Sequence, residues 1–199
     1  MAFWQNFSTK NGSYNLLAAN YLGKTIEKTR FQHLVIDRFF ENFCKKMILQ
    51  REKRESEKRA IFAVSERSLL TNRDIFIQPE IARGNISQID GEILKWKSET
   101  FHDILLKQFK MDPYFVYLKS SPEESFERIR ARERTEEKNI ELGYLREICE
   151  THERLYEKLS RNGENVLIIR IDDFKERQLS PKIDVNRIVG EILSFIGYR

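Results

Sequence analysis

Three short apolar runs constrain the fold of this 199-residue chain more than any other feature of its sequence. They are Ala60–Ser65, Tyr114–Lys119 and Val166–Ile171, which are rich in β-branched and aromatic residues and nearly continuously apolar. Strands that are covered on both faces of a parallel sheet have this composition, whereas half-exposed strands alternate apolar and polar residues. We therefore expect three buried parallel strands, with ligands bound at their carboxyl ends.

Helical patterns separate these runs. Phe31–Gln50 carries apolar residues at a 3.6-residue period, and Ile89–Phe109 is a second long helical stretch. Ser121 is suited to cap a third helix that has Pro122 at its first position. Two further helices are expected over Leu142–Leu159 and Ile183–Ile196, and a turn over Asn11–Asn15. The alternation predicts an α/β fold, in which helices flank a parallel sheet, as a single domain over residues 1–199.

The charge pattern favours a small anionic ligand over a nucleic acid. The net charge is 35 − 31 = +4, and in the densest basic stretch, Arg51–Arg59, acids are interleaved with bases so that their fields largely cancel. No nucleic-acid recognition motif appears, no apolar run is long enough to span a bilayer, and the N-terminus lacks a signal-peptide pattern. Cys44 and Cys149 are expected to be buried free thiols, neither nucleophiles nor zinc ligands. We expect a cytoplasmic protein that binds neither nucleic acid nor membrane.

An arginine-rich segment, Arg128–Glu137, follows the second apolar run and the turn after it. A guanidinium group is a permanently charged planar fork that matches phosphate oxygens in pairs. Several such groups on one segment can close over a polyphosphate and neutralise the charge that moves during phosphoryl transfer. The alternative is a solvated helix in which arginine and glutamate side chains pair one turn apart.

Two other places in the sequence offer polar groups suited to a ligand. Glu66-Arg67-Ser68 follows the first apolar run, where a carboxylate beside a guanidinium can hold a magnesium-bound water and a reacting oxygen. The alternative there is a structural ion pair. Gln32 could make two hydrogen bonds to the amide edge of a base, and the hydroxyl of Tyr21 could hold a sugar. Either residue could equally lie on the surface or at the edge of the core.

In their order and spacing these residues resemble the deoxynucleoside kinases, from Trp4 to the C-terminus. The matching motifs are Asn15…Tyr21…Phe31-Gln32, Glu66-Arg67-Ser68, Tyr117–Glu123, Arg128 to Glu136-Glu137, Tyr144-Leu145 and His152-Glu153. The resemblance implies a P-loop-kinase-like fold with an arginine-rich lid. It also implies a homodimer that transfers the γ-phosphoryl group of ATP to the 5′-hydroxyl of a deoxynucleoside, with Mg²⁺ bridging the phosphates.

The same resemblance implies a nucleoside site. Gln32 would bind the base edge, and Trp4 and Phe62 would wall the pocket. Tyr21 and Glu137 would clasp the 3′-hydroxyl of the deoxyribose.

It also implies a phosphate site. Arg67 would lie near the 5′-hydroxyl, and Glu66 would help to place Mg²⁺. The ATP phosphates would be bound by Arg128, Arg132 and Arg134, and the donor adenine would lie at Asp172, Asp173 and Phe174.

Base preference in such enzymes depends on two further positions. Purine- and cytidine-preferring members resembling this chain carry an arginine and an aspartate where Phe39 and Asn72 stand here. The difference favours the thymidine or broad-specificity branch. Asn72 could still form a hydrogen bond with a base.

One further departure from the family pattern is large. The family begins with a strand and a glycine-rich phosphate loop, and its general base is a glutamate that would stand before Met1. Gly23-Lys24-Thr25 is rejected as a replacement because Ala18 stands where the loop needs a glycine. The expectations are therefore a truncated reading frame or a homologue that binds nucleosides or dimerises without catalysis. Either chain, starting at Met1, should transfer little phosphate. An N-terminal extension would allow a mitochondrial location.

Overall fold

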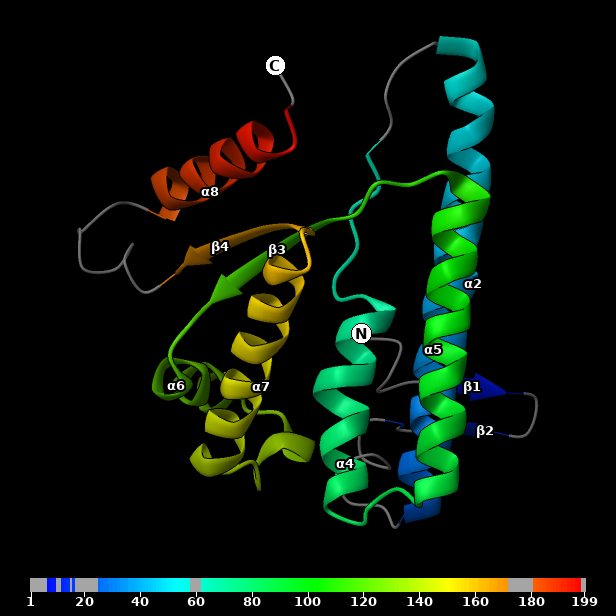
Figure 1. Cartoon of the computed structure of the whole chain (residues 1–199). Coiled ribbons are helices and arrows are strands. Elements are labelled where there is room, and N and C mark those ends of the chain that lie inside the picture. The colour runs from blue at the N-terminus through cyan, green and yellow to red at the C-terminus, as the bar shows by residue number, and fades with distance from the viewer. Residues whose placement is uncertain are drawn as a thin grey trace. The chain divides into compact units, whose positions relative to one another are not determined.

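The computed structural model describes residues 7–9, 12–14, 16, 25–57, 62–171 and 181–197. The chain forms two compact units, Met1–Met111 and Asp112–Arg199 (Figure 1).

The first unit begins with a small hairpin. Strand β1 (Phe7–Thr9) pairs antiparallel with β2 (Gly12–Tyr14), so that Phe7 lies opposite Tyr14. The prediction of a turn over Asn11–Asn15 is therefore wrong for residues 12–14. Glycine and serine favour turns, but pairing with β1 gives these three residues a strand's hydrogen bonds.

Two long helices, α2 (Thr25–Glu57) and α5 (Gln88–Phe109), run side by side in this unit (Figure 1). The sequence predicted both, and α2 extends beyond the predicted range at each end. The ring of Phe40 in α2 stacks on that of Phe101 in α5, with centroids 4.1 Å apart. The core between the helices and the segment that connects them contains Ile36, Leu69, Ile77, Ile86, Leu94 and Leu105.

The segment that connects these helices contains three short helical pieces that the sequence did not predict. They are α3 (Leu69–Thr71), the π-helix η2 (Asn72–Ile77) and α4 (Gln78–Ala82). Ser68 starts them, because its hydroxyl accepts a hydrogen bond from the backbone N–H of Thr71 and its own N–H donates to the Thr71 hydroxyl. No piece is long enough to show a helical period in the sequence.

The predicted strand Ala60–Ser65 is wrong where the structure describes it. Residues 62–65 have no regular secondary structure, and Phe62 and Val64 are 46% and 89% exposed. Residues 60 and 61 lie outside the described part. β-branched residues favour a strand only where a neighbouring strand supplies hydrogen bonds and cover, and none of the described strands pairs with this segment.

The second unit contains the predicted parallel sheet. Strand β3 (Tyr114–Lys119) pairs in parallel with β4 (Asn165–Arg170), from Tyr114 opposite Asn165 to Lys119 opposite Arg170. The crossover between them contains α6 (Pro122–Arg132), the short 3₁₀ turn η3 (Thr135–Glu137) and α7 (Leu142–Arg161). Ser121 caps α6 as predicted, since its side chain accepts a hydrogen bond from the Glu124 backbone N–H.

Helices flank this sheet on both faces. Tyr117 of β3 stacks on Tyr156 of α7 with ring centroids 4.7 Å apart, and burial raises the pKa of both hydroxyls. Tyr114 points to the opposite face, where its ring meets Phe195 of α8 (Pro181–Phe195) edge to face. The predicted parallel α/β sheet is thus confirmed for two of its three strands, although these are only partly buried: Leu118 and Ile168 are 45% and 48% exposed.

Candidate active site

Two amide side chains of the first unit are buried, and each has one polar atom without a hydrogen-bond partner among the described residues. Gln32 on α2 is 5% exposed and Asn72, the first residue of η2, is 4% exposed. Gln32 Oε1 and Asn72 Nδ2 have no partner among the described residues. Each lies one turn from a core residue, Ile36 and Leu69 respectively, so both amides adjoin the same core cluster. The sequence predicted Gln32 as a ligand residue, but burial of both amides emerges only from the structure.

Glu66 and Arg67 do not form the structural ion pair considered as the alternative. Both are exposed, and the Arg67 guanidinium lies over the Phe76 ring, 4.4 Å from its centroid. Arg67 has φ = 65°, a left-handed conformation that residues other than glycine seldom adopt. The two residues follow an irregular exposed segment rather than the carboxyl end of a strand, contrary to the prediction.

The predicted lid lies within the second unit, at the end of α6 and in η3. Arg132 Nη2 is 2.8 Å from Glu137 Oε2, and Arg134 Nη1 is 3.2 Å from Glu137 Oε1. The Glu137 side chain is 7% exposed, whereas those of Arg132 and Arg134 are 48% and 33% exposed. One buried carboxylate thus holds two arginines that keep further N–H groups for a ligand.

The other two arginines of α6 differ from this pair. Arg128 pairs with the buried Glu124 one turn earlier, which is the arrangement of the solvated-helix alternative. Arg130 is exposed, lies over the Phe126 ring and donates a hydrogen bond to the Lys138 carbonyl oxygen.

Several predicted site residues lie outside the described residues: Trp4, Tyr21, Asp172, Asp173 and Phe174. The rejected loop residues Ala18, Gly23 and Lys24 lie there too.

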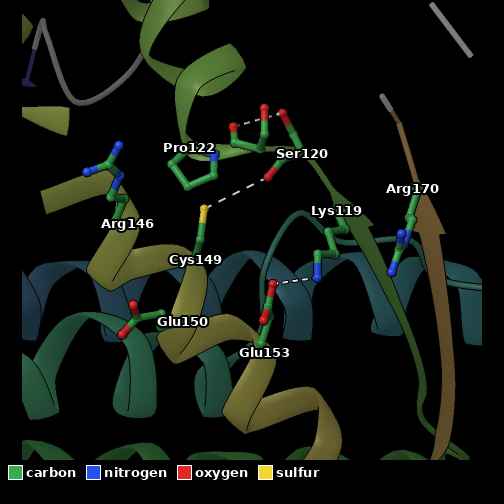
Figure 2. A pocket seen from close by; sticks show the side chains of 9 residues that line it. Lys119, Ser120, Pro122, Arg146, Cys149, Glu150, Glu153 and Arg170 are labelled. Atoms are coloured by element: carbon green, nitrogen blue, oxygen red, sulfur yellow. Dashed lines mark hydrogen bonds and ion pairs between the residues drawn. The ribbon is translucent and has the colours of Figure 1, made fainter. Parts of the chain in front are cut away.

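A cavity of about 350 Å³ lies at the carboxyl ends of β3 and β4 (Figure 2). Its walls include Lys119 and Arg170 from the strands and Arg146, Glu150 and Glu153 from α7. Lys119 Nζ lies 2.5 Å from Glu153 Oε1, so part of the charge in the cavity is paired internally. The sequence predicted ligands at the strand ends but singled out neither Arg146 nor Arg170.

The two cysteines are free, as predicted, but half-buried rather than fully buried. Burial raises the pKa of the Cys44 thiol, which disfavours the nucleophilic thiolate.

Within the described residues, no group of three or more metal-binding side chains is present, and no helix could cross a membrane. Mg²⁺ bound with a nucleotide takes one or two carboxylate ligands from the protein and its remaining oxygens from phosphates and water. A single carboxylate such as that of Glu66 is therefore enough to fit this ion.

Comparison with known sequences identifies the family. A sequence model described as deoxynucleoside kinase matches residues 3–196. The chain therefore belongs to the deoxynucleoside kinase family, as its sequence motifs predicted.

Relatives in the family differ in their named substrates. The chain is 33% identical to deoxycytidine kinase 2 of Gallus gallus over 66% of its own length and 51% of the relative's. It is 35% identical to human mitochondrial thymidine kinase 2, over 57% of this chain and 43% of that protein. The matches thus span about half the length of these relatives.

A solved structure shows the same fold. It is a deoxyadenosine kinase from M. mycoides with the products dCMP and a flexible dCDP bound. The TM-score is 0.56 at 18% identity, over 90% of this chain and 80% of the other. This similarity supports the P-loop kinase fold.

Proposed function

We propose that the protein transfers the γ-phosphoryl group of ATP to the 5′-hydroxyl of a deoxynucleoside. Membership of the deoxynucleoside kinase family supports the reaction type. The observation that carries the proposal for this chain is the pair of buried, unpartnered amides, Gln32 and Asn72.

A base edge would satisfy both amides. Burying a polar group without a partner costs about 1–3 kcal/mol, so native proteins rarely do it without a functional reason. A nucleobase offers N–H donors for the Gln32 carbonyl and ring or carbonyl acceptors for the Asn72 amide. Asn72 also begins a π-helix, a rare element that is frequent at functional sites.

The remaining roles follow the family pattern. Tyr21 and Glu137 hold the 3′-hydroxyl, Arg67 binds near the 5′-hydroxyl, and Glu66 contributes to Mg²⁺ binding. Trp4 and Phe62 line the nucleoside pocket. The ATP molecule is bound at its phosphates by Arg128, Arg132 and Arg134, and at its adenine by Asp172, Asp173 and Phe174.

The reaction forms a bond from the 5′-oxygen to the γ-phosphorus while the bond from that phosphorus to the β–γ bridging oxygen breaks and ADP leaves. The proton of the 5′-hydroxyl passes to a general base, a role that the family pattern gives to a glutamate before Met1. Mg²⁺ neutralises charge on the phosphates when it is bound. The fixed forks of the lid arginines bind oxygens whose charge is redistributed in the transition state, and so lower the barrier. Arg67 orients the attacking hydroxyl.

The first test replaces the Gln32 amide, whose burial without a partner costs free energy. Gln32→Leu should leave the free energy of unfolding unchanged or raise it, because an apolar group replaces an unsatisfied buried one. The same change should weaken deoxynucleoside binding by about 1–3 kcal/mol, measured by calorimetry. Ser98→Ala is the matched control: Ser98 is fully buried, but its hydroxyl is satisfied by the Leu94 carbonyl oxygen. It should not change nucleoside binding.

Transfer of phosphate from Mg-ATP to radiolabelled thymidine and deoxycytidine tests the chemistry separately. Nucleoside binding without transfer would show that residues 1–199 do not catalyse the reaction by themselves. Undiminished binding by Gln32→Leu would remove Gln32 from the base site.

We also propose that the protein is a homodimer. Ile89, Ile93, Trp96 and Ile104 of α5 are between 42% and 75% exposed. At 100° per residue they fall within an arc of about 80°. Trp96 is near the middle of this stripe, so a second copy related by a two-fold axis there places Ile89 against the region of Ile104.

Sedimentation equilibrium tests the assembly. Trp96→Glu should dissociate the dimer, because it puts a charge at the centre of an apolar contact. Gln88→Glu, on an exposed residue of the same helix that lies about 80° beyond the edge of this stripe, is the control and should remain dimeric. A monomeric wild-type protein would rule the dimer out.

A further inference from the structure

The Glu137 carboxylate pairs with two lid arginines and is also the proposed contact of the sugar 3′-hydroxyl. Its oxygens accept from Arg132 at 2.8 Å and from Arg134 at 3.2 Å. The backbone fixes the position of this residue: the Glu137 N–H donates to the Arg134 carbonyl oxygen, and the Ile140 N–H donates to that of Glu137. Both arginines are therefore held at one point of η3.

Because Glu137 is buried, its contacts with Arg132 and Arg134 are important for stabilising its charge. A carboxylate with a 7% exposed side chain cannot be well solvated by water, so it depends on the donors around it. If Arg132 and Arg134 turn toward phosphate oxygens, the carboxylate loses stabilising hydrogen bonds and positive charge. A hydroxyl that donates to Glu137 would replace part of what is lost.

We propose that Glu137 is a positioning residue that couples the two substrate sites. Without nucleoside it keeps Arg132 and Arg134 directed at itself. When the sugar 3′-hydroxyl donates to Glu137, the two arginines become available to the donor phosphates. This inference rests on the proposed function, and it predicts that each substrate tightens the binding of the other by the same factor.

The adjacent pair on α6 provides a matched comparison. Glu124 is also buried and paired with a lid arginine, Arg128, but it has no proposed substrate contact. If any buried carboxylate beside a lid arginine affected the coupling, Glu124→Gln and Glu137→Gln would behave alike. If Glu137 has the specific role proposed, only Glu137→Gln will abolish the coupling.

The experiment is a calorimetric titration with the Mg²⁺ complex of a non-hydrolysable ATP analogue. It is run on the wild-type protein alone, with saturating 2′-deoxynucleoside, and with the 2′,3′-dideoxynucleoside that lacks the 3′-hydroxyl. The deoxynucleoside should tighten analogue binding about fivefold or more, and the dideoxynucleoside less than twofold.

The variants extend this comparison. Glu137→Gln should bind the analogue more tightly than wild type when no nucleoside is present, and added deoxynucleoside should change that affinity less than twofold. Glu124→Gln should keep the wild-type coupling. A purely structural role for Glu137 predicts weaker, not tighter, analogue binding in Glu137→Gln.

The outcomes separate this inference from the proposed function. Binding of both substrates without coupling in the wild type, or equal coupling by the dideoxynucleoside, overturns the role of Glu137 alone. Coupling that persists in Glu137→Gln does the same. Failure of the wild type to bind any nucleoside overturns the proposed function and the inference together. The wild-type comparison needs no substitution, so it stands even if Glu137→Gln does not fold.

Discussion

Glu80 shows at the scale of one residue how the first unit is held together. Its carboxylate accepts from Lys28 at 2.9 Å, Arg83 at 2.7 Å and Asn85 at 3.0 Å. Burial of the side chain acts to raise its pKa, but the hydrogen bond and charge of Lys28, with the contacts to Asn85 and Arg83, hold that pKa below its usual value. The pair with Lys28 ties α4 to the start of α2.

This lowered pKa predicts a pH-dependent stability. The contribution of Glu80 should be complete above its unfolded pKa of about 4.3 and should be lost as the pH falls through its lower folded value. Glu80→Gln should cost about 1–3 kcal/mol of unfolding free energy at pH 7, and the difference from wild type should shrink in acid. Urea unfolding between pH 7 and pH 3 measures both. The exposed Glu92→Gln is the control, with an expected effect below about 0.5 kcal/mol.

The lid arginines give a second prediction at this scale. Arg132→Ala should lower the turnover rate of the active enzyme on the order of a hundredfold with a smaller effect on nucleoside binding. Arg132→Lys should restore only part of the rate, because lysine keeps the charge but lacks the planar fork. Steady-state kinetics with Mg-ATP would show this. Arg130 is exposed and has no proposed phosphate contact. If Arg130→Ala lowered the turnover rate as much as Arg132→Ala, the wrong arginines would have been assigned to the phosphates.

Among helices and strands, the sequence predicted those whose signal is local. β3 appears at the predicted residues, and α6 begins after the predicted Ser121 cap, because capping groups and a continuous apolar run are both read within a few residues. The prediction of a strand around Phe62 was wrong because strand formation depends on a partner strand elsewhere in the chain. The π-helix from Asn72 could not be predicted, since its hydrogen-bond pattern leaves no period in so short a segment.

A close approach between α4 and α5 gives a prediction at the scale of elements. A Cβ atom on Gly91 would lie 2.3 Å from Ile81 Cδ1 and 2.6 Å from its Cγ1. Gly91→Ala should therefore destabilise the protein by up to about 2 kcal/mol, although alanine favours a helix by about 1 kcal/mol. In an Ile81→Ala background the same substitution should become stabilising. Chemical denaturation of the wild type, the two single variants and the double variant tests the reversal of sign.

For the whole molecule, the sequence predicted site residues in both compact units: Gln32 and Arg67 in the first, Arg132 and Glu137 in the second. Family motifs suggested these residues because such motifs depend on residue type and order. They could not reveal that Asn72 is buried with a free amide, or that Glu137 binds two arginines. Both facts depend on contacts between side chains, which no local pattern encodes.

The cooperativity of unfolding can test whether residues 1–199 form a single domain. Both tryptophans, Trp4 and Trp96, belong to the first unit, whereas the stacked pair Tyr117 and Tyr156 belongs to the second. Tryptophan fluorescence therefore reports the first unit, whereas near-ultraviolet tyrosine dichroism is weighted toward the second, which contains five of the seven tyrosines. If residues 1–199 unfold as one domain, the two signals should give coincident transitions in urea. Separate midpoints would show two independently unfolding domains.

The exposed stretch from Phe62 to Arg67 is also a candidate site of proteolysis. Proteases bind an extended backbone, and this stretch presents one without strand hydrogen bonds, with Val64 89% exposed. Chymotrypsin after Phe62 and trypsin after Arg67 would both cut between α2 and α3, upstream of Asn72 and downstream of Gln32. A single early cleavage there would separate the two proposed base-binding residues onto different fragments while leaving each helix intact.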